Sequence, residues 1–152
     1  MTRSPLLTVA ESVAAQARTR PAKIAARDST RTLTYAALDD RASRLANGLL
    51  ALGLVPGDRV AVLAYNAIEW IEIYTALARA GLVAVPINFR LRGGEIAYIV
   101  RDAEATAVIA QDAFTELVDA ARSELAVLPS GYVCFGGAAP AGWQGYEAVI
   151  AA

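Results

Sequence analysis

The chain of 152 residues lacks histidine altogether and contains a single cysteine, Cys134. Without histidine it has neither the commonest general base nor the commonest zinc ligand, which excludes a Ser-His-Asp triad and a typical zinc site. One cysteine cannot form a disulfide within the chain. The 14 basic and 15 acidic residues nearly cancel, so no net field gathers nucleic acid or anionic lipid. We therefore expect no metal site and no nucleic-acid partner.

A long uninterrupted apolar segment is also missing. The longest stretch without a charged residue, 125–146, is broken repeatedly by glycine and proline, which makes it a poor transmembrane helix. Near the amino terminus, Glu11 interrupts the short apolar run that follows Arg3, so the pattern of a secretory signal is incomplete. We expect a cytoplasmic protein without a membrane span.

Short apolar runs alternate with helical patterns along most of the chain. Four such runs, rich in β-branched residues, read as strands: Val60–Leu63, Val83–Ile87, Ala107–Ala110 and Tyr132–Phe135. The gaps between them leave room for crossover helices, and the apolar fraction of 56% suits strands that are covered on both faces. The fold class predicted is α/β, with a mainly parallel sheet and helices on both of its faces.

Residues suited to turns and helix ends punctuate this pattern. Thr34 is expected to cap a helix that stops at Gly53, and Asn66 a second helix that stops at Gly81. Between these helices, Pro56-Gly57 suits the centre of a type II turn. Further helices are predicted over 9–17, 94–102 and 113–124, and a hairpin over 23–26 and 31–34. We expect residues 1–30 to form an amino-terminal lead-in and residues 31–152 a partial α/β subdomain.

The second of these helices has a mixed pattern of apolar and charged positions. Its apolar positions are expected to lie against the sheet and its charged positions to point into solvent. The expected inward set is Ile68, Ile71, Leu77 and Ala78, and the expected outward set is Glu72 and Arg79. Glu69 is expected to reach back to the exposed amide at the start of the helix, as in a capping box. The two glutamates then form a solvated pair without a catalytic role.

Neither of two common phosphate-binding patterns follows the predicted strands. A dinucleotide fold needs a glycine-rich loop after its first long strand, where this chain has 64–69, AYNAIE. A phosphoacceptor domain needs clustered aspartates at the strand ends, and Ile87-Asn88 stands at one of them. A free-standing flavodoxin-like binding module and a structural or regulatory module remain as alternatives.

The order of several short segments resembles one enzyme superfamily. Leu33-Thr34-Tyr35, GLVPGDRV at 53–60 and GLVAVPINFRL at 81–91 follow one another as in the amino-terminal region of AMP-forming acyl-CoA synthetases. That superfamily also includes nonribosomal-peptide adenylation domains, which stay open as an alternative, and beetle luciferases. The resemblance covers nearly the whole chain and implies the first part of the large amino-terminal domain of an adenylate-forming enzyme.

The resemblance implies a two-step ligation that uses ATP, Mg²⁺ and CoA. A carboxylic acid attacks the α-phosphate of ATP, and the thiol of CoA then displaces AMP to give an acyl-CoA, as in fatty acid metabolism. In the family, the phosphate loop, the metal-binding glutamate and the catalytic lysine come later in the polypeptide. We therefore assign no catalytic residue and expect an inactive fragment that associates with itself and whose partner is the missing carboxy-terminal portion.

Four residues are candidates for substrate contacts by the same resemblance. In several acyl-CoA ligases the arginine of an Asn-x-Arg-Leu segment lies near the CoA phosphates, which points to Arg90, with Arg92 adding to the field. The alternative is that Arg90 pairs with Glu95 or faces water. Asn66 and Trp70 follow a predicted strand and are candidates for the border of an acyl pocket. The alternative for this pair is a helix cap and a core aromatic.

Overall fold

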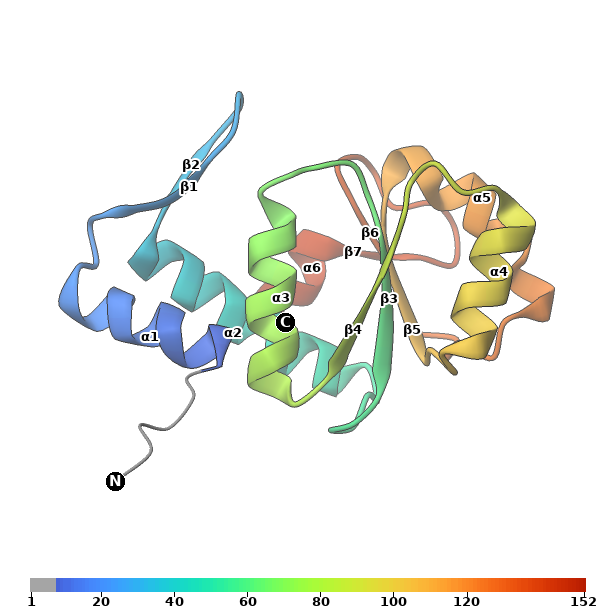
Figure 1. Cartoon of the computed structure of the whole chain (residues 1–152), viewed down its shortest axis with the longest axis horizontal. Helices are drawn as coiled ribbons and strands as arrows, with labels where there is room; N and C mark the ends of the chain where they lie inside the picture. The colour runs from blue at the N-terminus through green and yellow to red at the C-terminus, as the bar shows by residue number, and fades with distance from the viewer. Residues whose placement is uncertain (1–7) are drawn as a thin grey trace, which may run out of the picture.

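The apolar runs form the strands of one parallel sheet in the computed structural model, which describes residues 8–152 (Figure 1). The sheet order is β4-β3-β5-β6-β7, so the chain first moves outward from β3 to β4 and then returns past β3 to continue on its other side. The strands are β3 (Arg59–Leu63), β4 (Val83–Ile87), β5 (Ala107–Gln111), β6 (Tyr132–Phe135) and β7 (Gln144–Gly145). The mainly parallel α/β fold predicted from the sequence is confirmed.

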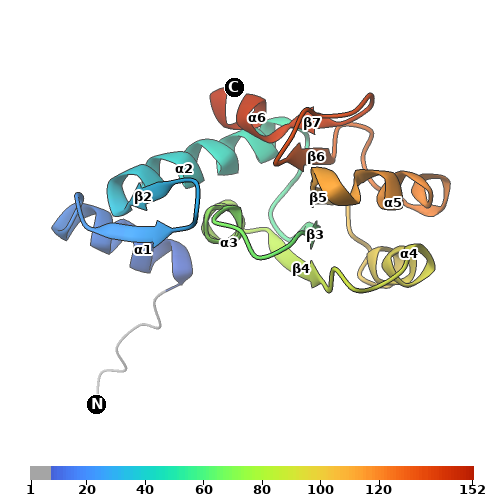
Figure 2. The same cartoon turned by 90° about the horizontal axis from the view of Figure 1, so that it is seen from above.

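Helices cover both faces of this sheet (Figure 2). On one face lie α2 (Tyr35–Ala51), α3 (Glu69–Ala80) and α6 (Tyr146–Ala151), and on the other α4 (Gly93–Asp102) and α5 (Thr115–Asp119). Along β3, Val60 and Val62 pack toward the first set, while Ala61 and Leu63 pack toward the second. All four side chains are fully buried, which explains why the strands read as continuous apolar runs.

A smaller unit lies beyond α2 and α3, on the side away from the sheet. It consists of α1 (Val9–Thr19) and the antiparallel hairpin of β1 (Ile24–Arg27) with β2 (Thr32–Thr34). Val13 and Leu33 join Leu38 and Ile68 in a separate apolar cluster that fixes this unit to the two helices. The predicted helix and hairpin are both present. None of the helices in the described part of the chain combines the length and the apolar character needed to cross a bilayer.

Several predicted helix ends and one predicted turn are also confirmed. The Thr34 hydroxyl accepts a hydrogen bond from a backbone amide three residues along, at 3.2 Å, as an N-cap does. Asp58 N donates to Val55 O at 3.0 Å around Gly57, whose φ of 96° is the positive angle that a type II turn requires. Gly81 ends α3 in the left-handed conformation, with φ 71°.

The start of α3 differs from the prediction, because Asn66 does not cap it. Ile68 occupies the cap position and makes no side-chain cap bond, while Asn66 is exposed in the preceding loop. The first helical amides, from Trp70 and Ile71, donate instead to the carbonyls of Ala67 and Ile68 in a tightened turn. Backbone carbonyls therefore satisfy these two donors at the start of α3.

The faces of α3 were predicted only in part, because Ile68 and Leu77 are buried as expected but other positions are not. Ile71 and Ala78, which were expected to lie against the sheet, are exposed, while Ile73 and Ala76 are buried there. Glu72 was expected to point into solvent and is instead completely buried, with 0% of its surface exposed. The reason is that α3 packs against α2 as well as against the sheet. Its buried face therefore includes positions, such as Glu72, that lie outside the apolar stripe predicted from the sequence.

The helix predicted over 113–124 is divided into three short pieces. A 3₁₀ turn over Asp112–Phe114 precedes α5, and a second over Arg122–Glu124 follows it. Between them, Asp119 accepts hydrogen bonds from the indole N–H of Trp143 at 3.0 and 3.1 Å. The guanidinium of Arg122 lies 3.7 Å from the Tyr132 ring centroid. These contacts with later parts of the chain turn the backbone away from a continuous helix.

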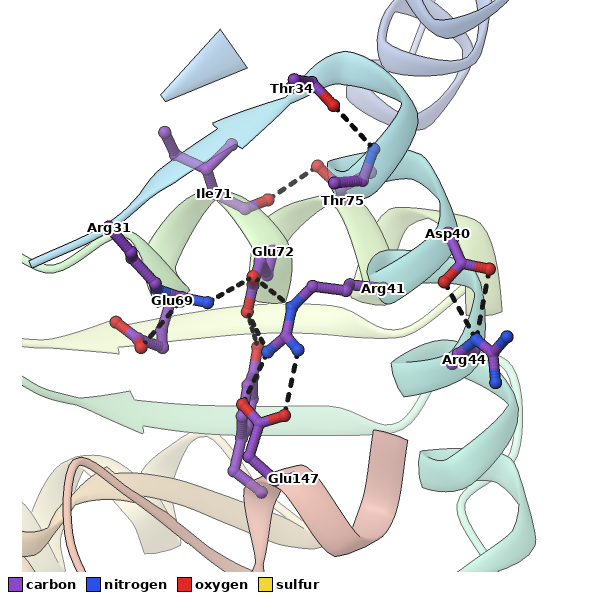
Figure 3. Close-up of polar contacts among 12 residues, drawn as sticks. Arg31, Thr34, Asp40, Arg41, Arg44, Glu69, Ile71, Glu72, Thr75 and Glu147 are labelled. Atoms are coloured by element: carbon purple, nitrogen blue, oxygen red, sulfur yellow. Dashed lines mark hydrogen bonds and ion pairs between the residues drawn. The ribbon is translucent and has the colours of Figure 1, made fainter. Parts of the chain in front are cut away.

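A network of ion pairs around Glu72 joins the hairpin to three helices (Figure 3). The Glu72 carboxylate accepts from Arg41 Nε of α2 at 2.7 Å and from the Tyr146 hydroxyl of α6 at 2.9 Å. Arg31 Nη1, from the hairpin loop, lies 3.3 Å away. A fully buried carboxylate is tolerated only with such partners, so these four elements are held in one arrangement.

Two further carboxylates complete this network. Arg41 donates to both oxygens of Glu147 at 2.9 and 2.6 Å, and Arg31 donates to Glu69 at 2.8 Å. The hydrogen bonds from Arg41 lower the pKa of Glu147, while bonding to Glu147 and then to Glu72 raises the pKa of Arg41 against the opposing effect of burial. Burial, followed by the charge of Glu72, raises the pKa of Tyr146. The tyrosine therefore stays a neutral donor.

We expect Glu72→Ala to lower the free energy of unfolding by about 3 kcal/mol. The substitution leaves the partly buried guanidinium groups of Arg31 and Arg41 without this carboxylate and removes the acceptor of the Tyr146 hydroxyl. Glu147→Ala is the matched control, since it removes a carboxylate of the same network whose side chain is 69% exposed. That variant should lose less than about 1 kcal/mol. Urea unfolding followed by circular dichroism measures both changes. Equal losses of stability in the two variants would show that the burial of Glu72 does not make its ion pairs more important than those of the exposed Glu147.

A second prediction concerns the crossing of α2 and α6 at Gly48. A Cβ on this residue would overlap the carbonyl oxygen of Val149 and lie 2.6 Å from its Cγ1. Gly48→Ala should therefore cost about 1–3 kcal/mol of stability by overpacking. Gly94→Ala, in α4, meets no atom within 4 Å and should be neutral or stabilising by up to about 1 kcal/mol. Urea unfolding measures both variants. An equal fall of the urea midpoint in Gly48→Ala and Gly94→Ala would contradict the close crossing of α2 and α6.

Candidate functional site

The carboxyl ends of β3, β4, β5 and β6 lie side by side at the top of Figure 1, and this end of the sheet is called the carboxyl edge below. Open parallel sheets bind ligands at this edge, next to the point where the strand order reverses. Here the reversal lies between β3 and β5, because the chain leaves β3 toward β4 and returns past it. The loops around this point form the candidate site.

The hairpin loop and this edge of the sheet border an open cavity of about 530 Å³. One wall is the loop 28–31, which the network around Glu72 holds in place through Arg31. The other lining residues come from the strand ends and from two helices: Asn66, Ala67, Glu69, Gln111, Phe135, Gly136 and Glu147. A second hollow of about 410 Å³ continues beside β6 and α6 and shares Glu69, Phe135, Gly136 and Glu147.

Most charges on the cavity wall are compensated. Glu69 is paired with Arg31, and Glu147 with Arg41, which leaves side-chain amides as uncharged groups for a ligand. Gln111 uses its Oε1 to accept from Tyr65 N at 3.0 Å, across the reversal point, and so links β5 to the loop after β3. The wall is therefore suited to hydrogen bonding with a polar ligand, and it is fixed by contacts within the protein.

Covalent chemistry and metal binding find no support in this geometry. Cys134 lines the second hollow, but burial and then the charge of Asp112 raise the pKa of its thiol, which keeps it protonated. Within residues 8–152, no group of three or more aspartate, glutamate, cysteine or histidine side chains is placed to hold a metal ion.

The two candidates for an acyl pocket are placed differently from one another. Asn66 lines the cavity, whereas Trp70 is half-buried against the core and lies 5.5 Å from the ring of Tyr74. The indole N–H of Trp70 donates to Tyr65 O at 2.9 Å, so it supports the loop that carries Asn66. The structure does not bring Asn66 and Trp70 together in one cavity wall, and their contact with an acyl group stays a prediction.

The two candidate arginines lie in the loop between β4 and α4. Arg90 is exposed, its backbone amide donates to Asn88 Oδ1 at 3.0 Å, and its guanidinium lies 5.7 Å from the ring centroid of Phe89. No ion pair joins Arg90 to Glu95 in the described part of the chain. Glu95 instead accepts from the backbone amide of Arg92 at 2.8 Å. Both guanidinium groups are thus available at the carboxyl edge.

Sequence reasoning missed four residues that shape this edge. Gln111 is the last residue of a strand, and the rule that ligands gather at strand ends was sufficient to single it out. Tyr65, directly after β3, carries the same signal. Arg31 and Glu147 carry no comparable local signal, because tertiary contacts alone bring them to the cavity.

Comparison with known proteins places the chain within a family of adenylate-forming enzymes. The family described as AMP-binding enzyme matches residues 13–143. The chain is 42% identical over 117 residues to a feruloyl-CoA synthase from Amycolatopsis sp, an alignment that covers 76% of this chain and 24% of that protein. It is 35% identical over 114 residues to the fatty acid–[acyl-carrier-protein] ligase ScoC of Streptomyces coeruleorubidus, covering 75% of this chain and 22% of ScoC.

Solved structures of ligases have the same fold over this region. The crystal structure of the anthranilate CoA ligase AuaEII in complex with anthranoyl-AMP superposes with a TM-score of 0.91 at 26% identity, covering 97% of this chain and 29% of that one. The chain spans about a quarter of the length of the curated relatives it matches. Because the family match extends over most of its residues, the chain belongs to the AMP-binding enzyme family.

Proposed function

We propose that the chain is the amino-terminal part of an ATP-dependent carboxylic acid:CoA ligase, which forms an acyl-adenylate and then an acyl-CoA thioester. The observation that carries this proposal is the similarity of most of the chain to a feruloyl-CoA synthase, together with the fold shared with an acyl-adenylate-bound CoA ligase. A stand-alone flavodoxin-like module is less favoured, because the family match runs across the helices and the sheet alike.

The chain's own part in this reaction is to position substrates. Adenylation needs cations and backbone amides around the phosphates of ATP. The sequence has no glycine-rich phosphate loop after β3 or β4, and the described residues have no metal cluster. We infer that the groups that bind ATP and Mg²⁺, with the catalytic lysine, belong to the remaining three quarters of the protein. The present chain then supplies the scaffold and the edge of the sheet.

Arg90 and Arg92 are the residues that we assign to the phosphates at the nucleotide end of CoA. A guanidinium presents forked donors that match phosphate oxygens, and the hydrogen bond that the Arg90 amide donates to Asn88 Oδ1 fixes the backbone of this loop. Asn66 is assigned to the border of the acyl pocket, since it lines the cavity, and Trp70 supports it from behind. None of these residues is assigned a catalytic role.

The rest of the protein is the partner that we assign to this chain. Ile71 and Tyr74 on α3 and Val83 on the edge strand β4 are exposed apolar side chains, each 38–48% exposed. Apolar groups of this kind suit a protein contact. In the absence of the remaining protein, the same surface favours self-association of the chain.

A second candidate function concerns the thiol that accepts the acyl group. ScoC, which is named as an acyl-carrier-protein ligase, matches nearly as much of this chain as the CoA synthase does. A carrier protein presents its thiol on an arm without the free nucleotide end of CoA. The two functions therefore differ in whether Arg90 meets a phosphate of the acceptor.

We expect the purified 152-residue chain to show no exchange of pyrophosphate into ATP with ferulic, anthranilic or long-chain fatty acids, because it has no phosphate-binding loop. The complete protein that carries this chain should show exchange with at least one such acid. Exchange by the chain alone would overturn its assignment as a scaffold. Absence of both exchange and thioester formation in the complete protein would overturn the ligase assignment.

In the complete protein, Arg90→Ala should raise the KM for CoA about tenfold and leave pyrophosphate exchange unchanged, because a charged hydrogen bond to phosphate is worth roughly 1.5–3 kcal/mol. Arg101→Ala is the matched control, since Arg101 is an exposed arginine paired with Glu124 on the surface. Steady-state kinetics of thioester formation measures both variants. An unchanged KM for CoA in Arg90→Ala would favour the carrier protein as acceptor.

A further inference from the structure

The tip of the β1–β2 hairpin, residues 27–32, borders the candidate cavity but belongs to no apolar cluster of the described chain. The stem below the tip is anchored by Leu33, which is buried together with Val13, Leu38 and Ile68. Among the described strands, β1 and β2 pair only with one another. A two-stranded hairpin without further support is only marginally stable. Polar contacts therefore set the position of the tip.

One side chain, that of Arg31, joins the tip to the body of the protein (Figure 3). Its Nη2 donates to Glu69 Oε1 at 2.8 Å, and its Nη1 lies 3.3 Å from Glu72 Oε1. Within residues 8–152, no other hydrogen bond or ion pair links the tip to a residue outside the hairpin. The position of the tip beside the cavity thus depends on the two ion pairs of one arginine.

The tip is bonded internally and lies above an irregular part of the stem. Asp28 Oδ1 accepts hydrogen bonds from Thr30 N, the Thr30 hydroxyl and Arg31 N at 2.7, 2.8 and 2.8 Å. Directly below the tip, the register of the β1–β2 pairing shifts between Ile24 and Ala26. Such an irregularity disrupts the ladder locally and bends the strand. The tip can therefore move as one unit while the stem bends.

Release of Arg31 leaves no buried charge without a partner. Glu72, which is fully buried, keeps Arg41 Nε at 2.7 Å and the Tyr146 hydroxyl at 2.9 Å. The side chains of Arg31 and Glu69 are 29% and 19% exposed, so water can solvate both when they separate. Separating a pair that is in contact with water costs far less than leaving a buried ion unpaired. The ion pairs of Arg31 can therefore open and close without unfolding of the protein.

We propose that residues 27–32 form a lid over the cavity and that Arg31 is the latch that holds this lid closed. In the closed arrangement the tip is one wall of the cavity. When Arg31 leaves Glu69 and Glu72, the tip swings away on the irregular stem and the cavity opens to solvent. A tip of this length reaches about 10 Å beyond its stem, so the swing moves Ser29 by several ångströms. The lid is a property of this chain and does not depend on the acid or thiol that the complete protein uses.

Movement of the tip is measured by double electron–electron resonance between spin labels on Ser29→Cys and Glu116→Cys, in a Cys134→Ala background. Glu116 is exposed on α5 and serves as the fixed point. The parent should give one narrow distance, and Arg31→Ala should add a population shifted by about 5 Å or more. Arg31→Lys, which keeps the charge, should return most of this population to the parent distance. Arg27→Ala is the matched control, because Arg27 is an exposed tip arginine whose hydrogen bond stays within the hairpin, and it should keep the narrow distance.

Access to the cavity is measured by the rate at which a maleimide labels Ala67→Cys in the same background, since Ala67 lines the cavity and is half-buried. The rate follows the population of the open form, and loss of the Arg31 ion pairs should raise it about fivefold. Arg27→Ala should leave the rate unchanged. Sodium chloride at about 1 M, which shortens the screening length to about 3 Å, should act on the parent in the same direction as Arg31→Ala.

An Arg31→Ala chain that keeps the narrow distance or the labelling rate of the parent would overturn the lid. An equal response of Arg27→Ala would overturn the latch, because the tip would then move for a reason other than the ion pairs of Arg31. If Arg31→Ala does not fold, Glu69→Gln, which removes the charge of one partner, and the salt series on the parent decide the same question by the same two measurements.

Discussion

The buried carboxylate of Glu72 is the constraint on which the candidate site depends. A fully buried charge requires cations and donors within hydrogen-bond distance, and these come from α2, α6 and the hairpin loop. Replacing such a cluster with apolar residues is often neutral for stability. The effect of the cluster here is therefore to fix how the hairpin and the helices lie relative to one another. Arg31 cannot pair with Glu72 unless the hairpin lies over the carboxyl edge of the sheet, where its loop forms a wall of the cavity.

The bond between Tyr65 N and Gln111 divides this edge into two sides. Toward α3 and α6 lies the polar cavity, lined by Asn66 and Gln111 themselves. Toward α4 lie the adjacent rings of Tyr65 and Phe114, and Phe114 belongs to the core on that face of the sheet. One short loop after β3 therefore presents Tyr65 to one side and Asn66 to the other. Under the proposed function, the acid and the nucleotide end of CoA approach the sheet from these two sides.

Local patterns predicted most elements of the fold, because the apolar runs of the strands, one helix cap and one turn are marked by neighbouring residues, whereas the Asn66 cap and the continuous helix over 113–124 were wrong. The strand runs, the Thr34 cap and the turn at Gly57 depend on nothing further along the chain. Glu72 shows where this reasoning stops. Its partners Arg41 and Tyr146 stand 31 and 74 positions away, and no periodicity in α3 marks it as buried. The cavity was missed for the same reason, since tertiary contacts bring its walls together.

Charge distinguishes the two sides of the edge more sharply than shape. In the network beside the cavity, three carboxylates face two guanidinium groups, and Asp28 adds a further negative charge to the lining. On the other side, the guanidinium groups of Arg90 and Arg92 form no ion pair among the described residues, and the nearby Glu95 carboxylate accepts from the backbone amide of Arg92. At a separation of several ångströms near a protein surface, the interaction energy of a phosphate with a carboxylate and that with a guanidinium group differ by a few kcal/mol. Under the proposed function, we expect the phosphates of CoA to approach on the side toward α4 and the less charged acid to approach the cavity.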